Sequence, residues 1–250
     1  MSAYARFARY YDVLTQNVGY AKRAEYFDNI IKQNLQDAGL LLDLACGTGS
    51  LSMEMAARGY DVIGVDASQE MLSVALQKAV QSEKDILFLC QPMQRLDLYG
   101  TVDACVCALD SLNHLPDEAA LEQVLARLKL FVRPGGIFLF DVNTAYKHSH
   151  VLGNHIFVYD LPQVYCVWQN SYHREHHRVD IALDFFVPGA NGAEYRRFSE
   201  RFSERVFSHD VILRQLERAG FTCAACYGDD TLLEPGPETQ RLVYVAKREE

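Results

Sequence analysis

The chain has 250 residues, of which 49% are hydrophobic and 23% are charged, so it can bury a full core as one large domain or as a core with an insertion. Its formal net charge is -9, from 24 basic and 33 acidic residues. This balance argues against a nucleic-acid partner, which usually requires a basic face.

The first 38 residues or so have helical periodicity. One apolar stripe includes Tyr10 and Leu14, and another includes Phe27 and Ile31. From residue 40 onward, apolar segments alternate with helical ones, which predicts a parallel sheet covered on both faces. We expect strands at 40–45, 61–66, 86–90, 102–109 and 137–142, and helices at 50–58, 68–81 and 117–131.

The periodicity changes after Asn143. Apolar and polar residues alternate from Val179 to Val187, as in a half-buried strand, and Pro188 to Gly192 supply a turn. We therefore predict an antiparallel β cap over residues 150–207, inserted into a core formed by 1–149 and 208–250. Two further strand-like segments of the cap are 155–172 and 194–207, and the core resumes with a helix at 209–219 and strands at 221–227 and 241–247. The fold class is then α/β, with a Rossmann-like seven-stranded mixed sheet and an antiparallel insertion after the fifth strand.

A glycine-containing turn follows the first predicted strand. It reads Asp43-Leu44-Ala45-Cys46-Gly47-Thr48-Gly49, and the next strand ends in Asp66. Glycines let the backbone approach a ligand closely, and an acid at the end of the second strand can accept hydrogen bonds from both ribose hydroxyls. A dinucleotide site would need a third glycine, in the pattern G-x-G-x-x-G, and this turn lacks it.

This turn resembles motif I of the class I S-adenosylmethionine-dependent methyltransferases. The similarity extends over nearly the whole chain and is strongest to the YqeM-like and glycine N-methyltransferase-like groups. The segments that carry it are Tyr10-Tyr11-Asp12, Arg23-Ala24-Glu25-Tyr26, Asp43 to Gly49, Val65-Asp66-Ala67-Ser68, Asp110 to Pro116, Val132-Arg133-Pro134-Gly135-Gly136, Asp141-Val142-Asn143 and Leu183 to Val187.

The resemblance implies S-adenosylmethionine as the cofactor, S-adenosylhomocysteine as the product, and a set of contacts to the cofactor. Arg23 would pair with the cofactor carboxylate, and Tyr11 would cover the methyl group. The other implied contacts are Ala45 and Gly47 to the methionine part, Asp66 and Ala67 to the ribose, Met71, Gln91 and Met93 to the adenine, Leu109 to the amino group through its backbone, and His114 beside the sulfonium.

The chain departs from its relatives at two positions. Gln91-Pro92-Met93 replaces the Asp or Asn that often binds the adenine amino group, so this contact would fall to Gln91, to the backbone or to a weaker site. Val142-Asn143 replaces the arginine that glycine-specific enzymes carry after the fifth strand, which argues against glycine as the substrate.

Methyl transfer needs alignment and, where the nucleophile carries a proton, a base. Tyr11, Asp110 and His114 are the catalytic candidates, although Asp110 could instead cap a turn and His114 could pack under the cap. The candidates for substrate contact are Asn113, Asn143, Arg197 and Arg201. The two arginines belong to a strand face that could bind an anion or could simply pair with Asp180 or Asp184.

His173, His176 and His177 lie in a charged turn without a closing cysteine pair, so we expect no metal site. The seven cysteines are scattered, the N-terminus lacks a signal-peptide core, and no apolar stretch reaches the roughly 18 residues of a membrane span. We therefore expect a cytoplasmic monomer or homodimer with reduced thiols, no membrane association and a small-molecule substrate.

The favoured function is methyl transfer to a nitrogen or oxygen atom of a small, perhaps anionic, molecule. Two alternatives remain open at this point. One is a catalytically silent protein that binds S-adenosylmethionine, and the other is an NAD-dependent dehydrogenase, which would share the glycine turn and the ribose-binding acid.

Overall fold

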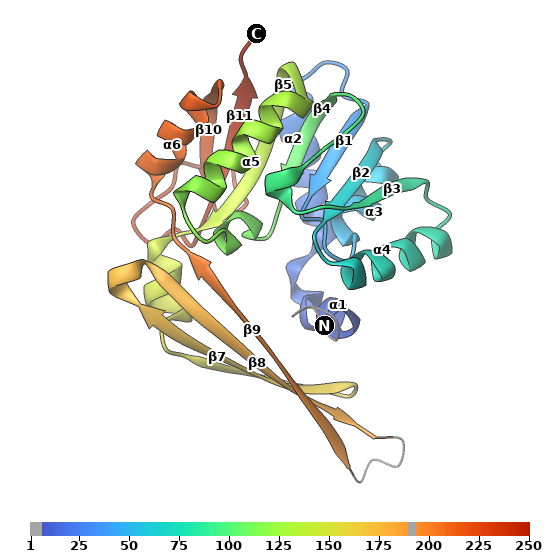
Figure 1. Cartoon of the computed structure of the whole chain (residues 1–250), viewed down its shortest axis with the longest axis vertical. Coiled ribbons are helices and arrows are strands. Elements are labelled where there is room, and N and C mark those ends of the chain that lie inside the picture. Colours follow the sequence, from blue (N-terminus) through green and yellow to red (C-terminus); the bar gives the residue numbers. More distant parts are fainter. Residues whose placement is uncertain (1–6, 190–193) are drawn as a thin grey trace.

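The computed structural model describes residues 7–189 and 194–250. Its centre is a seven-stranded sheet with the order β10-β11-β5-β4-β1-β2-β3, in which β1 to β5 are parallel and β11 runs antiparallel to both of its neighbours (Figure 1). The predicted mixed sheet is therefore present. Its strands are β1 (Leu40–Leu44), β2 (Asp61–Asp66), β3 (Ile86–Cys90), β4 (Val102–Cys107), β5 (Val132–Asn143), β10 (Phe221–Gly228) and β11 (Arg241–Arg248).

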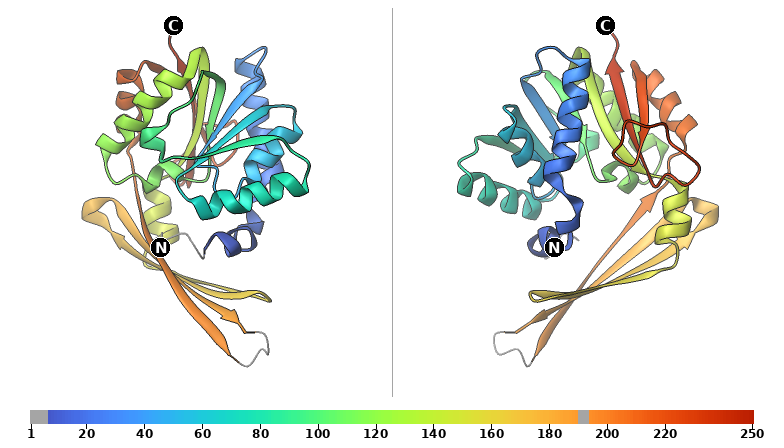
Figure 2. Two further views of the ribbon diagram at one scale, coloured as in Figure 1. Left: turned by 45° about the vertical axis from the view of Figure 1, so that its right-hand side comes forward. Right: turned by 180° about the vertical axis from the view of Figure 1, so that it is seen from behind.

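Helices cover both faces of this sheet, as the continuous apolar strands require. The helices α2 (Tyr20–Asn34) and α3 (Ser50–Ala57) pack on one face, and α5 (Glu118–Phe131) and α6 (His209–Arg218) pack on the other (Figure 2). The helix α4 (Gln69–Gln81) packs along β2 and β3. Side-chain N-caps begin three of these helices, because Ser68, Asp117 and Ser208 each accept a hydrogen bond from the backbone N–H three residues later.

A second sheet of four antiparallel strands lies between β5 and α6 in the chain. Its strands are β6 (Ile156–Leu161), β7 (Val164–His173), β8 (Arg178–Pro188) and β9 (Tyr195–Arg205), paired in this order. The predicted strand 155–172 is thus wrong in detail, because a tight turn after Leu161 divides it into a hairpin. The predicted turn from Pro188 to Gly192 lies largely outside the described residues, since these stop at Gly189.

Short helical turns join these elements near the carboxyl ends of the strands. The 3₁₀ turns are η1 (Gln16–Val18), η2 (Met93–Arg95), η3 (Ser111–His114) and η5 (Arg174–His176), and the turn Lys147–Leu152, labelled η4, is a π-helix. Of the described helices, none is long and apolar enough to span a bilayer. The division into a core and a cap at residues 149/150 and 207/208 stays a prediction.

The first helix, α1 (Ala8–Leu14), lies between the core and the second sheet (Figure 1). The ring of Phe7 lies 5.7 Å from that of Phe185, and the ring of Tyr10 lies 5.9 Å from that of Phe198. These aromatic contacts and the buried aliphatic side chains of β7 and β8 form an apolar cluster separate from the two that flank the main sheet. The helix α1 therefore closes the space between the two sheets.

Candidate active site

A cavity of about 950 Å³ occupies this space between the two sheets. Its floor is formed by the carboxyl ends of the parallel strands, where ligands bind in open α/β sheets. Its other walls come from α1, η1, the π-helical turn and the inner face of the second sheet. Most of the cofactor and catalytic residues predicted from the sequence line this one cavity: Tyr11, Ala45, Gly47, Asp66, Ala67, Met71, Gln91, Met93, Leu109, Asp110 and His114, together with the substrate candidate Asn143.

The glycine turn has the backbone geometry expected of a close approach to a ligand. Gly47 and Gly49 have φ values of 54° and 73°, in the left-handed region that favours glycine. A Cβ on Gly47 would meet nothing within 4 Å, because this side of the residue is open. A Cβ on Gly49 would lie only 2.9 Å from the Cβ of Ala75, so this glycine allows α3 and α4 to pack closely.

Asp66 is the acid at the end of β2 that faces the cavity. One carboxylate oxygen accepts a 2.8 Å hydrogen bond from the N–H of Gly47, and the other accepts one of 2.8 Å from Ser68. Burial raises the pKa of Asp66, while these backbone donors act in the opposite direction. A carboxylate has about four acceptor positions, so two remain for a pair of ribose hydroxyls. The residues present therefore fit the ribose of a nucleoside cofactor.

Two residues expected to flank the adenine, Met71 and Met93, line one side of the cavity together with Pro92. The side chain of Gln91, one of the alternatives for binding the adenine amino group, forms hydrogen bonds within its own loop. Its amide oxygen accepts a 2.8 Å hydrogen bond from the N–H of Asp97, and its amide nitrogen donates to the carbonyl of Asp97 at 3.1 Å. These contacts favour the other two alternatives, the backbone or a weaker site.

The end of β4 has two consecutive residues, Leu109 and Asp110, with positive φ values of 58° and 54°. Such a conformation is costly for residues other than glycine and must be held by its surroundings. The fully buried carboxylate of Asp141 does this, because it accepts hydrogen bonds from the N–H groups of both residues, at 3.1 and 2.5 Å. Leu109 can therefore contact the cofactor amino group only through its carbonyl oxygen.

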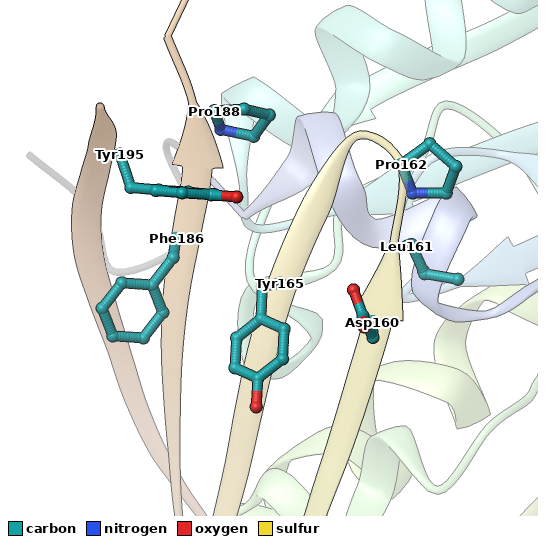
Figure 3. Close-up of a pocket in the computed structure, with 7 residues that line it drawn as sticks. All are labelled: Asp160, Leu161, Pro162, Tyr165, Phe186, Pro188 and Tyr195. Atoms are coloured by element: carbon teal, nitrogen blue, oxygen red, sulfur yellow. The ribbon is translucent and has the colours of Figure 1, made fainter. Parts of the chain in front are cut away.

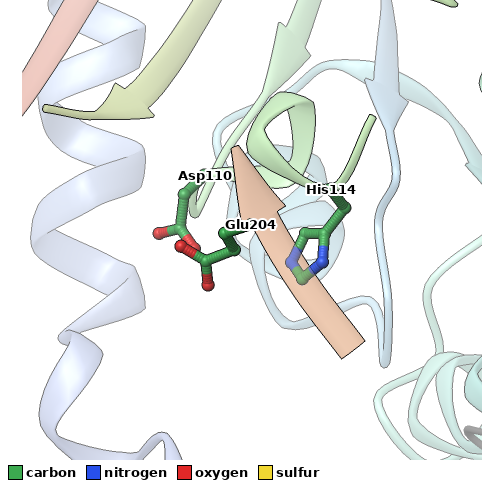
Figure 4. A group of neighbouring side chains, drawn as sticks. All are labelled: Asp110, His114 and Glu204. Atoms are coloured by element: carbon green, nitrogen blue, oxygen red, sulfur yellow. The ribbon is translucent and has the colours of Figure 1, made fainter. Parts of the chain in front are cut away.

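The two ionisable catalytic candidates at this strand end have different surroundings. Asp110 pairs with Arg241 at 2.8 Å, so it is not merely a turn cap. His114 is exposed and lines the cavity near Asp110 (Figure 4). The centroid of its ring lies 5.3 Å from that of Phe202. Tyr11 enters the cavity from α1, and burial raises the pKa of its hydroxyl well above the usual range, which keeps the ring neutral.

Arg23 does not line the cavity, contrary to the sequence expectation. Its guanidinium is buried and pairs with Asp141 at 2.5 Å and with Asp230 at 2.6 Å. The aspartates neutralise this charge within the protein, so Arg23 supports the ends of β5 and of the loop after β10. The sequence places these two aspartates 118 and 207 residues away, and no local pattern indicated the pairing.

The other substrate candidates are also placed differently from the prediction. Asn113 is buried and ties η3 to the N–H and carbonyl of Asn143 and to the carbonyl of Arg205, so it is a structural residue. Arg197 and Arg201 lie on the exposed outer face of β9, away from the cavity. Arg197 pairs with Asp184 at 2.9 Å, which is the surface pairing considered as the alternative.

Several cavity residues were missed in the sequence. Lys147 lies on the π-helical turn, burial lowers its pKa, and its ammonium donates to the side chain of Asn143 at 2.8 Å. Glu204 reaches the cavity from β9, and Trp168 from β7. A signal for Glu204 existed, because strand alternation places it on the same face as Phe202, where a glutamate on an apolar face is unusual.

A polar contact holds the helical lid against the glycine turn. Asp12 of α1 accepts hydrogen bonds from Thr48 at 2.6 Å and Ser50 at 3.2 Å, and it pairs with Lys78 of α4 at 2.5 Å. The lid, the turn and α4 therefore share one ion pair. Since α1 carries Tyr11, this contact also positions the residue expected over the methyl group.

A second hollow, of about 310 Å³, lies on the outer face of the second sheet. Figure 3 shows Asp160, Tyr165, Phe186 and Tyr195 on neighbouring strands around it. None of the predicted site residues lines this hollow, and it is remote from the carboxyl ends of the parallel strands.

Comparison with known proteins agrees with this site. A profile of a methyltransferase domain matches residues 41–136. The chain is 34% identical over 246 residues to the methyltransferase-family protein YqeM of Bacillus subtilis (strain 168), and the match covers 98% of this chain and 97% of that protein. A crystal structure of an S-adenosylmethionine-dependent methyltransferase from Clostridium acetobutylicum ATCC 824 superposes with a TM-score of 0.88 at 29% identity, over 100% of both chains. These matches exclude the dehydrogenase alternative, and the chain belongs to the YqeM-like group of class I S-adenosylmethionine-dependent methyltransferases.

Proposed function

We propose that this enzyme methylates a nitrogen or oxygen atom of a small molecule held in the cavity between the two sheets. The observation that carries the proposal is that one continuous cavity joins the glycine turn and Asp66 to the inner face of the second sheet. Its volume of about 950 Å³ is near the upper end of small-molecule sites, so a cofactor and a small acceptor can share it. The arginine face of β9 gives no support to an anionic acceptor, because Arg197 and Arg201 face away from the cavity.

When bound, S-adenosylmethionine supplies an electrophilic methyl group on a sulfonium sulfur. In this proposal Asp66 accepts both ribose hydroxyls, and Met71 and Met93 flank the adenine. Gly47 permits the close approach of the backbone to the methionine part. Tyr11 presents its ring or its neutral hydroxyl to the positive sulfur region, which favours the charged cofactor.

The protein has to align the acceptor and exclude water, because the thioether leaves as a neutral group and needs no acid. The helical lid formed by α1 and η1 excludes water, because it covers the cavity and Asp12 holds it against the glycine turn. His114 is available to take a proton from the acceptor, because it is exposed to the cavity at the end of β4.

The first test is calorimetric titration of the purified protein with S-adenosylhomocysteine, with NADH in parallel. We expect micromolar binding of S-adenosylhomocysteine alone, and binding at least tenfold weaker in Asp66→Ala. A screen of small acceptors then measures the S-adenosylhomocysteine released from S-adenosylmethionine. Tight cofactor binding without turnover of any acceptor would instead favour the catalytically silent alternative.

A further inference from the structure

A buried carboxylate lies at one end of the cavity, and the proposed methyl transfer assigns it no role. Glu204 lies at the end of β9, and its side chain is only 5% exposed although it lines the cavity. Its carboxylate accepts a 2.9 Å hydrogen bond from the side chain of Asn143 and lies 3.1 Å from the Nε2 of His148, which is fully buried. These two partners fix the carboxylate in position, and its remaining acceptor positions can face a ligand.

A second carboxylate lies beside it. The side-chain ligand atoms of Asp110, His114 and Glu204 all lie within 4.8 Å of one another, and Figure 4 shows the two carboxylates next to each other with the imidazole opposite. Asp110 immediately precedes η3 and Glu204 lies on β9, so the two acids are more than 90 residues apart in the chain. Like charges at this separation repel, so a cation between them would be stabilised.

The charges around this end leave room for one positive group on a ligand. Four carboxylates and three arginine or lysine side chains lie at this end of the cavity among the described residues, and His148 is the ion-pair partner of Glu204 when its imidazole is protonated. The acids are Asp110, Asp141, Glu204 and Asp230, and the cations are Arg23, Arg241 and Lys147. Asp141 and Asp230 are bound by the arginines on the protein side, whereas Glu204 has no arginine or lysine within ion-pair distance among the described residues.

The inner face of the second sheet, which carries Glu204, is otherwise aromatic and apolar. It contributes the rings of Phe157, Tyr159, Trp168 and Phe202 to the cavity. Aromatic faces attract cations and apolar bodies and offer nothing to a phosphate or a carboxylate. The two carboxylates and these rings together fit an organic cation with an apolar body.

We propose that the methyl acceptor is an amine, anchored through its nitrogen by Glu204 with Asp110, and packed through its apolar body against the aromatic wall of the second sheet. This inference rests on the proposed methyl transfer and names its substrate class. The amine arrives protonated, an imidazole nitrogen of His114 takes one proton, and the nitrogen lone pair then forms the C–N bond as the C–S bond breaks. The products are the methylated ammonium and neutral S-adenosylhomocysteine, and the proton on His114 passes to water.

The test uses matched sets of ligands that differ only in the polar group. Phenethylamine, 2-phenylethanol and 3-phenylpropionate form one set, and hexylamine, hexanol and heptanoate form another. Each is titrated calorimetrically into the full-length protein saturated with S-adenosylhomocysteine, and methylation is followed with S-adenosylmethionine. We expect the amine of at least one set to bind about tenfold or more tightly than its alcohol and its acid, since the buried carboxylate forms a charged hydrogen bond only with the amine.

Glu204→Gln keeps the shape of the side chain and removes its charge. We expect it to reduce the preference for the amine over the alcohol at least tenfold, while the affinity for S-adenosylhomocysteine stays unchanged. Glu200→Gln is the matched control, because Glu200 lies on the same face of β9 but does not line the cavity, and this variant should keep the preference.

Three results would overturn the inference while leaving the proposed function intact. They are tighter binding of the acids or alcohols, no binding of any amine, and an amine preference that survives in Glu204→Gln. Binding of Mg²⁺ or Mn²⁺ that Glu204→Gln abolishes would also overturn it, since the carboxylates would then belong to a metal ion. If the protein fails to bind S-adenosylhomocysteine at all, the proposed function itself fails.

Discussion

The buried carboxylate of Asp141 contacts two arginines and two backbone N–H groups. Replacing it by an amide tests how much this buried charge contributes to the free energy of unfolding. Asp141 is fully buried and accepts hydrogen bonds from three donors, the guanidinium group of Arg23 at 2.5 Å and the N–H groups of Leu109 and Asp110 at 3.1 and 2.5 Å. It also forms an ion pair with Arg241 at 2.9 Å. Asp141→Asn keeps the size of the side chain but removes the charge and turns one acceptor into a donor.

Breaking a buried ion pair by removing one partner costs about 3–5 kcal/mol. Arg23 keeps Asp230 and Arg241 keeps Asp110, so we expect the lower end, about 3 kcal/mol of the free energy of unfolding. With a urea m-value of about 3 kcal/mol/M, the midpoint of unfolding should fall by about 1 M. The assay is urea denaturation followed by far-UV circular dichroism at neutral pH.

Asp103→Asn is the matched control, because Asp103 also holds two backbone N–H groups and an arginine. It accepts from Gly39 and Leu40, both at 2.9 Å, and from Arg133 at 2.6 Å, but its side chain is 22% exposed. Water can replace part of these interactions, so we expect a loss of only about 1 kcal/mol. If Asp141→Asn lowers the free energy of unfolding no more than Asp103→Asn does, burial does not determine how much these carboxylates contribute to stability, and the reasoning is refuted.

Three further predictions concern the glycine turn and its surroundings. Burial raises the pKa of Asp43 to about 7, so the stability that this group contributes is complete below the unfolded pKa of about 4 and is lost as the pH rises to about 7. Asp43→Asn should therefore gain stability relative to the parent protein between pH 4 and 7, by on the order of 2–4 kcal/mol, and a pH-independent difference in urea unfolding would contradict this. Gly49→Ala should lower the free energy of unfolding by about 2 kcal/mol or more, because the new Cβ would meet Ala75. Gly47→Ala should lower it by only about 1 kcal/mol and should mainly weaken the binding of S-adenosylhomocysteine. Thermal melting measures the first effect and calorimetry the second, and equal stability losses in the two variants would refute the distinction. Asp12→Asn should weaken S-adenosylhomocysteine binding by about three- to tenfold through loss of the lid contact, with little change in melting temperature, and an unchanged affinity would show that the lid does not contribute to binding.

Most of the core fold could be predicted from local patterns. Continuous apolar strands and helical stripes each depend on residues close in the chain, and these patterns placed the parallel strands within a few residues. The strand at 155–172 was predicted as one element, because the turn between β6 and β7 carries no glycine and interrupts the apolar pattern for only two residues, Pro162 and Gln163.

The candidate site was predictable where a ligand contact and a strand end coincide. Asp66 ends β2, and Gly47 and Asp110 come three residues after the ends of β1 and β4. The carboxyl ends of parallel strands meet at one edge of the sheet. Long side chains could not be placed in the same way. The sequence shows that Arg23 and Arg197 are cations, but which acid neutralises each one depends on strands that are distant in the chain.

Taken alone, the sequence determined the α/β fold class, the glycine turn and the order of the elements, because these depend on short-range periodicity and on the backbone freedom of glycine, and its resemblance to a known family indicated the class of enzyme. The tertiary structure decided which polar groups are available to a ligand. It used Arg23, Asn113 and the Gln91 side chain in internal hydrogen bonds, turned Arg197 outward, and brought Glu204 to the cavity. The physical reason is that a buried polar group must find a partner, and the three-dimensional packing alone determines which partners lie within reach.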